Sequence, residues 1–136
     1  MERRPRILLI DDDPSFITIN KLVLQKHSFE VMAASSAREG IDLAMRWQPD
    51  LIVMDVMLES QTEGLHATYE LRQDPALRDV PILMITAINT TNYPWRLEPD
   101  ENWLPVDSLL DKPVEPDRLV QEVNRLLAQR EALPTG

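Results

Sequence analysis

Residues 7–14 read Ile-Leu-Leu-Ile-Asp-Asp-Asp-Pro, an apolar run that stops abruptly at three aspartates. Four consecutive apolar residues of this kind are typical of a strand buried on both faces, as in a parallel sheet covered by helices. The Asp-Pro pair that follows supplies an N-cap and a proline at the first helical position. The stretch therefore predicts a buried strand that leads directly into a helix.

The same alternation continues along the chain. Further apolar runs predict strands at 31–34, 51–54 and 80–85, with a weaker one at 108–110. Helical patterns fill most of the intervals, from 13–14 to about 24, from the capping box at 36–39 to the proline at 49, at 64–73 and at 116–130. Strands that alternate with helices predict an α/β fold, a doubly wound five-stranded parallel sheet with helices on both faces.

The interval 88–107 breaks this pattern. It carries prolines at positions 94, 99 and 105, which would interrupt a helix repeatedly, so we expect the fourth helix to be short, distorted or absent. Tyr93, Trp95 and Trp103 lie in the same interval. Two interpretations stay open for these aromatic residues: a local core that fixes an irregular loop, or a surface that binds a partner.

Size and composition limit the possible functions. The 136 residues suit one domain, which we place at 1–130, followed by a frayed tail at 131–136. Fourteen basic and 23 acidic residues give a net charge of −9, which disfavours direct contact with nucleic acid or anionic membranes. The lack of cysteine excludes thiolate metal sites, and the start of the chain does not resemble a signal peptide, so we expect a cytoplasmic protein.

Chemistry is expected where the apolar runs end, because ligands of open α/β sheets bind beyond the carboxyl ends of the strands. Asp11 and Asp12 follow the first run and Asp55 follows the third. If these strands are neighbours, the three carboxylates converge and repel one another unless a cation neutralises them. Mg²⁺ suits such oxygen ligands. The simpler alternative, a helix cap and a solvated loop at 11–13, leaves Asp55 unexplained.

Two further residues stand at strand ends. Lys112 follows the fifth run and supplies a positive charge, and Thr86 ends the fourth run with a hydroxyl group. A carboxylate nucleophile, a divalent ion, a lysine and a hydroxyl are the groups that can receive a phosphoryl group and stabilise its charge. The four strand ends together therefore predict a phosphoryl-acceptor site.

Four motifs resemble the signatures of response-regulator receiver domains of two-component signalling, in particular of the chemotaxis-regulator type. They are the stretch at 7–14, Pro-Asp-Leu-Ile-Val-Met-Asp at 49–55, Pro-Ile-Leu-Met-Ile-Thr-Ala at 81–87 and Asp-Lys-Pro at 111–113. The resemblance covers residues 5 to about 130. It implies a flavodoxin-like fold and an aspartate, here Asp55, that is phosphorylated by a histidine kinase or a histidine phosphotransfer protein.

The resemblance also implies a role for each site residue. Asp12, Asp55 and the backbone carbonyl of Met57 would bind Mg²⁺ directly, and Asp11 would act through water. Thr86 and Lys112 would hold the phosphoryl oxygens. It further implies a cis peptide bond between the lysine and the proline at 113.

One position departs from the family pattern in a way that affects signalling. Leu109 stands where receivers usually carry an aromatic residue, so the usual coupled movement of threonine and aromatic side chain is not predicted. We expect a stand-alone receiver that signals through contact with a downstream protein of unknown identity. Two alternatives are a non-phosphorylated adaptor of the same fold, and a phosphatase with an aspartate nucleophile. The phosphatase requires an acid at the position of Met57.

The sequence predicts slow self-dephosphorylation. Met57 and Ile88 occupy the two positions that place the attacking water in the family, and neither side chain can orient water. The double variant Met57→Asn, Ile88→Glu should therefore shorten the half-life of the phosphorylated protein, measured by loss of the acyl phosphate. An unchanged half-life would contradict this explanation.

Overall fold

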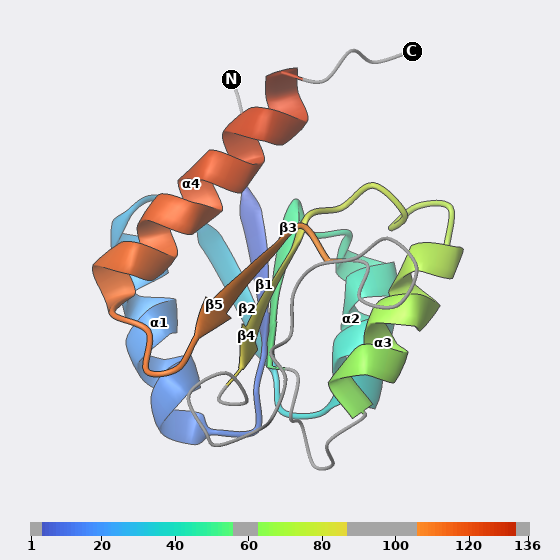
Figure 1. Cartoon of the computed structure of the whole chain (residues 1–136), viewed down its shortest axis with the longest axis horizontal. Helices are drawn as coiled ribbons and strands as arrows, with labels where there is room; N and C mark the ends of the chain where they lie inside the picture. Colours follow the sequence, from blue (N-terminus) through green and yellow to red (C-terminus); the bar gives the residue numbers. More distant parts are fainter. Residues whose placement is uncertain (1–3, 56–62, 87–105, 133–136) are drawn as a thin grey trace, which may run out of the picture.

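The computed structural model describes residues 4–55, 63–86 and 106–132 of the chain. Five strands form one parallel sheet in the order β2-β1-β3-β4-β5 (Figure 1). The elements follow one another as β1 (Arg6–Ile10), α1 (Pro14–Lys26), β2 (Glu30–Ala34), α2 (Ala37–Trp47), β3 (Leu51–Asp55), α3 (Glu63–Gln73), β4 (Ile82–Thr86), β5 (Ser108–Asp111) and α4 (Pro116–Ala132).

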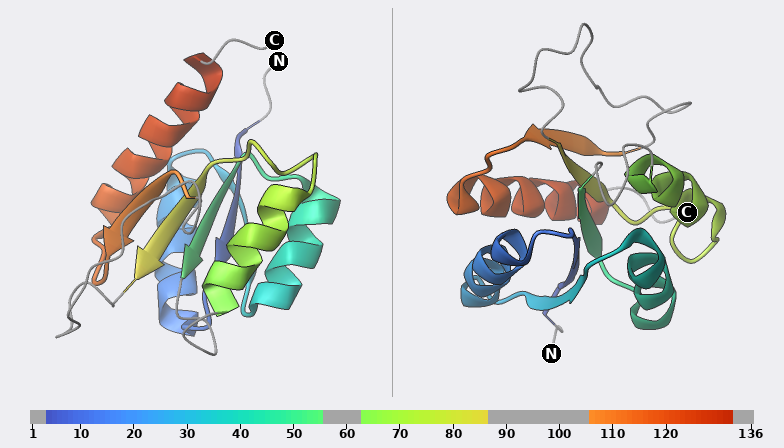
Figure 2. Two further views of the ribbon diagram at one scale, coloured as in Figure 1. Left: turned by 45° about the vertical axis from the view of Figure 1, so that its right-hand side comes forward. Right: turned by 90° about the horizontal axis from the view of Figure 1, so that it is seen from below.

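The strand order places the carboxyl ends of β1 and β3 side by side at the centre of the sheet. After β2 the chain crosses back over β1 to form β3, so the winding direction reverses between β1 and β3. Open α/β sheets have their ligand crevice at such a reversal. The strand arrowheads share one edge of the sheet (Figure 2). The fold thus presents Asp11 and Asp55 at the same edge.

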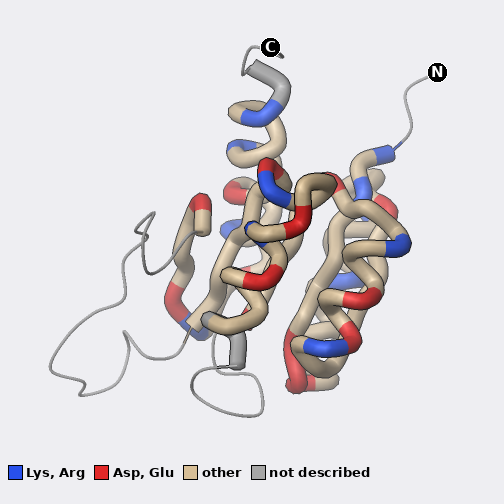
Figure 3. The backbone as a smooth tube through the Cα atoms, turned by 90° about the vertical axis from the view of Figure 1, so that its right-hand side faces the viewer, with Lys and Arg blue, Asp and Glu red and all other residues tan. Residues whose placement is uncertain are grey.

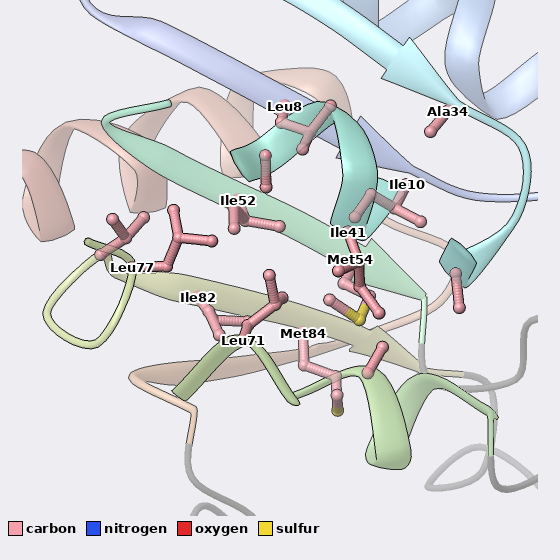
Figure 4. Packing of buried hydrophobic residues seen from close by; sticks show 14 of the residues in the cluster. Leu8, Ile10, Ala34, Ile41, Ile52, Met54, Leu71, Leu77, Ile82 and Met84 are labelled. Carbon is pink, nitrogen blue, oxygen red and sulfur yellow. The ribbon is translucent and has the colours of Figure 1, made fainter. Parts of the chain in front are cut away.

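The inner strands β1, β3 and β4 are buried on both faces because their alternate residues enter two different cores. Helices α2 and α3 cover one face and form what we call the α2/α3-side core (Figure 4). Its strand residues include Leu8, Ile10, Ile52, Met54, Ile82 and Met84. Helices α1 and α4 cover the other face and form the α1/α4-side core (Figure 2). Its strand residues include Ile7, Leu9, Leu51, Val53, Leu83 and Ile85.

The α/β fold class, the parallel five-stranded sheet and the helices on both faces are confirmed. The predicted start of the fourth strand was wrong by two residues, since β4 begins at Ile82. Val80 is buried but donates its N–H to the carbonyl of Leu77, so it belongs to the preceding turn. Pro81 has no N–H and pairs with β3 only through its carbonyl, which accepts the N–H of Ile52. The last helix runs to Ala132, two residues beyond the prediction. The expected irregular fourth helix, Tyr93, Trp95 and Trp103 lie outside the described residues.

The surface of the helices carries charges of both signs. Figure 3 shows acidic and basic positions intermixed along α2 and α3, and an exposed ion pair of 3.3 Å joins Arg38 of α2 to Glu70 of α3. Such a pair contributes little to stability. Within the described ranges, no helix is both long and apolar enough to cross a lipid bilayer.

Helix α4 is fastened to β5 by a buried carboxylate. Glu122 is only 4% exposed, yet it accepts hydrogen bonds from the hydroxyl of Ser108 at 3.0 Å and from the guanidinium of Arg125. Burial opposes the charge of Glu122, but these hydrogen bonds and the positive charges of Arg125 and Arg118 outweigh it and hold its pKa below the usual range. This network fixes the strand that leads to Lys112.

Replacing this carboxylate should destabilise the protein in a pH-dependent way. Glu122→Gln is expected to lower the free energy of unfolding by about 1–3 kcal/mol at pH 7, because hydrogen bonds to a buried charged group are lost. A depressed pKa stabilises the fold above the pKa of the unfolded chain, so the difference should shrink as the pH falls below about 4. Urea unfolding measures it. Glu70→Gln is the exposed control, and equal effects of both variants would contradict the account.

Candidate functional site

Asp11 is held in place by its own backbone and by the turn that follows. Its N–H donates to the carbonyl of Ala34 at 3.1 Å, which extends the β1–β2 pairing by one residue. Its Oδ1 accepts the N–H of Asp13 at 2.9 Å, and Asp13 in turn caps α1 by accepting the N–H of Ser15. The side chain of Asp11 is 1% exposed. The strand-to-helix junction therefore fixes one buried carboxylate at the sheet edge.

Asp55 ends β3 and lies beside this carboxylate. It is 6% exposed and pairs in register with Ile85 of β4. Asp11, Asp12 and Asp55 each offer a carboxylate oxygen, and these oxygens lie within 4.8 Å of one another. Asp12 is exposed, so the group opens to solvent on its side. The convergence predicted from the strand ends is therefore present.

Lys112 brings a positive charge between two of the carboxylates. Its Nζ donates to Asp11 Oδ2 at 3.1 Å and to Asp55 Oδ2 at 2.9 Å. Its backbone N–H donates to the carbonyl of Thr86 at 2.8 Å, which continues the β4–β5 pairing past Asp111. The Lys112–Pro113 peptide bond is cis, in agreement with the family resemblance.

Burial and the neighbouring charges shift the pKa values of Asp11 and Lys112. Desolvation by burial is the largest influence on Asp11 and raises its pKa, together with the negative charge of Asp55, while the Asp13 N–H and Lys112 act in the opposite direction. Burial alone would lower the pKa of Lys112, but the hydrogen bonds and negative charges of Asp55 and Asp11 outweigh it and raise that pKa. The lysine is therefore protonated at neutral pH.

Two other predicted residues are placed less directly. Thr86 is fully buried at the end of β4, one residue past the register partner of Asp55, so its position at the site follows from the strand pairing. Leu109 is half-buried and packs against the α2/α3-side core. Met57, the predicted backbone ligand, lies outside the described residues.

The sequence reasoning missed one neighbour of the lysine. Lys112 Nζ lies 5.1 Å from the centre of the Phe16 ring, on the first turns of α1. Apolar spacing predicts only that Phe16 belongs to the apolar stripe of that helix. Phe16 and Lys112 are far apart in the sequence, so no local motif predicts their contact. The position of Phe16 one turn after Asp12 does place it at the same edge of the sheet.

The donor set fits a hard divalent cation. Three carboxylates and one ammonium group leave an excess of negative charge in a partly buried space, and oxygen is the ligand type that Mg²⁺ prefers. The excess charge and the open side at Asp12 fit an ion that keeps several waters. Asp11, Asp12 and Asp55 are the described residues that could hold it.

Comparison with known proteins agrees with this geometry. The sequence matches the response regulator receiver domain family over residues 7–124. It is 32% identical over 130 residues to the DNA-binding dual master transcriptional regulator RpaA of Synechocystis sp., covering 96% of this chain and 52% of RpaA. It is 29% identical over 126 residues to protein PilH of Pseudomonas aeruginosa, covering 90% of this chain and 98% of PilH. A solved sensor protein from Polaromonas sp. is similar with a TM-score of 0.79 and 26% identity, covering 93% of this chain and 98% of its own.

The fold, the acidic site and the family match together define a receiver, a class of phospho-accepting signalling domain. The chain belongs to the response regulator receiver domain family of two-component systems. It spans about half the length of RpaA and nearly the whole length of PilH.

Removing the lysine should expose the repulsion that it offsets. Lys112→Met is expected to lower the free energy of unfolding by about 1–3 kcal/mol without divalent ions, because two buried carboxylates lose their charged donor. Adding Asp11→Asn should recover part of the loss, since one buried charge is then removed. Urea unfolding in a chelating buffer measures both. Lys26→Met is the exposed control, and a Lys112 variant as stable as this control would contradict the account.

Proposed function

We propose that Asp55 accepts a phosphoryl group from a phosphohistidine of a histidine kinase or a histidine phosphotransfer protein. The observation that carries the proposal is the hydrogen bond of 2.9 Å between Lys112 Nζ and Asp55 Oδ2 within a partly buried acidic cluster. The strand order supports Asp55 over the other acids. β3 lies between β1, which brings two carboxylates, and β4 and β5, which lead to Thr86 and Lys112. Asp11 also contacts Lys112, but Asp55 ends the strand that pairs with both β1 and β4, so it lies between the two sets of groups.

In the proposed reaction, a carboxylate oxygen of Asp55 attacks the phosphorus atom. An oxygen–phosphorus bond forms while the phosphorus–nitrogen bond to the donor imidazole breaks, and the nitrogen keeps the electron pair. The Lys112 ammonium group would shift its hydrogen bond from the carboxylate to a phosphoryl oxygen as the negative charge moves there. Only a small movement is needed because the ammonium group already lies at Asp55. The Thr86 hydroxyl would hold a second phosphoryl oxygen.

We assign the metal site to Asp11, Asp12, Asp55 and the backbone carbonyl of Met57, with Asp11 acting through water. Mg²⁺ bound there would neutralise the carboxylates and the phosphoryl oxygens. Among the described residues, Asp12 is suited to direct binding because it is exposed, whereas Asp11 is committed to Asp13 and Lys112. The protein would assist its own phosphorylation and dephosphorylation without acting as a turnover enzyme.

The signal would leave the domain through contact with a downstream protein. A net charge of −9 argues against nucleic acid and anionic membranes as direct partners, and we place the protein in the cytoplasm, where histidine kinases present their phosphohistidine. Leu109 is half-buried against the α2/α3-side core, so an inward movement there would repack an aliphatic side chain. The rearrangement that reports phosphorylation would therefore differ from the family's threonine–aromatic coupling.

The proposal predicts binding of beryllofluoride, a phosphoryl mimic, in the presence of Mg²⁺. Wild-type protein should bind it, and Asp55→Asn should abolish binding because a neutral amide replaces the carboxylate that would bind beryllium. Isothermal titration calorimetry measures the affinity. Asp13→Asn is the matched control, since asparagine also caps a helix and Asp13 lies at the same edge.

Two outcomes separate the proposal from its alternative. Binding that depends on Asp55 supports the phospho-acceptor. Absence of binding by the folded wild-type protein would favour a non-phosphorylated adaptor of the same fold.

A further inference from the structure

The ammonium group of Lys112 is surrounded on more than one side. Two of its three N–H donors are used by Asp11 Oδ2 and Asp55 Oδ2. The Phe16 ring centre lies 5.1 Å from the same nitrogen, within the range of a cation–π interaction. The lysine side chain is 24% exposed, so the ring meets a partly desolvated cation.

The backbone and the core hold the Phe16 ring in place. Phe16 lies in the first turns of α1, whose start is set by the Asp13 cap and Pro14. Its side chain packs against the α1/α4-side core, and its carbonyl accepts the Nδ2 of the buried Asn20 at 2.9 Å. Phe16 and Lys112 line one groove between α1 and the segment that joins β5 to α4. The Phe16 ring is therefore held in a fixed position beside the flexible side chain of Lys112.

A fixed ring can restrain Lys112 because lysine carries its charge at the end of a flexible four-carbon chain. Without a restraint, Nζ can leave the acceptor carboxylate for solvent, and each return costs side-chain entropy. The electron-rich face of an aromatic ring attracts the ammonium group while leaving its N–H donors to the oxygens. An ammonium group held this way needs little reorganisation when charge moves from Asp55 to a phosphoryl oxygen.

We propose that Phe16 is a positioning residue for phosphoryl transfer, which holds the Lys112 ammonium group at Asp55 through a cation–π contact. This inference rests on the proposed function of Asp55. It adds a residue that touches neither the phosphoryl group nor the metal.

The test varies the ring's charge distribution while nearly preserving its shape. Phe16 is replaced with mono-, di- and trifluorophenylalanine, which progressively weaken the negative ring face. Beryllofluoride affinity in Mg²⁺ is measured for each protein. The affinity should fall stepwise, by about 3- to 10-fold over the series, the size expected for a partly desolvated cation–π contact. A packing role alone would leave the affinity constant.

A second readout needs neither metal nor phosphoryl mimic. In the metal-free protein, the ε-CH₂ protons of Lys112 should resonate upfield because of the Phe16 ring current, and Phe16→Leu should remove that shift. Ile17→Val is the control, because Ile17 packs against the same core from the neighbouring position. This variant should leave the shift in place and change the affinity by less than about 2-fold.

The outcomes separate the two proposals. Binding that depends on Asp55 but is constant across the fluorinated series overturns the role of Phe16 and leaves the acceptor intact. A wild-type protein that does not bind beryllofluoride overturns the acceptor, and the role of Phe16 in phosphoryl transfer falls with it.

Discussion

The structure depends on bringing like charges together at one edge of a parallel sheet. Asp11 and Asp55 are almost fully buried beside each other, and Asp12 lies within reach of both. Buried carboxylates this close repel strongly, and burial raises the pKa of Asp11. Lys112 offsets part of this cost by donating to both buried acids. The remaining negative charge is what a divalent cation bound to these oxygens would neutralise.

The two cores supply the rigidity that this arrangement requires. Alternate residues of β1, β3 and β4 anchor the sheet against α2 and α3 on one face and α1 and α4 on the other, so the strand ends cannot move apart to relieve the repulsion. The Glu122 network ties β5 to α4 next to the loop that carries Lys112. The cap at Asp13 fixes α1 and with it the ring of Phe16. Stability and function therefore draw on the same contacts.

The site was more predictable from sequence than some of the features that support it. Parallel strands share one edge for their carboxyl ends, so apolar runs that stop at Asp11, Asp55 and Thr86 had to bring these residues together. The apolar run at 80–85 wrongly included Val80 in the strand, because its buried side chain belongs to the preceding turn. The burial of Glu122 was not predictable, because an acid on a helix usually faces water and its partner Ser108 is on another element. The contact of Phe16 with Lys112 depends on how α1 sits on the sheet, which apolar periodicity does not encode.

The central claim is that, of the clustered acids, Asp55 is the acceptor. It is tested most directly by mapping the acyl phosphate. The protein is incubated with acetyl phosphate and Mg²⁺, trapped by borohydride reduction, digested and analysed by mass spectrometry. The account predicts a reduced residue at position 55 and none at Asp11, Asp12 or Asp13. Modification at one of those three aspartates, or an unmodified Asp55 in the folded protein, would contradict it.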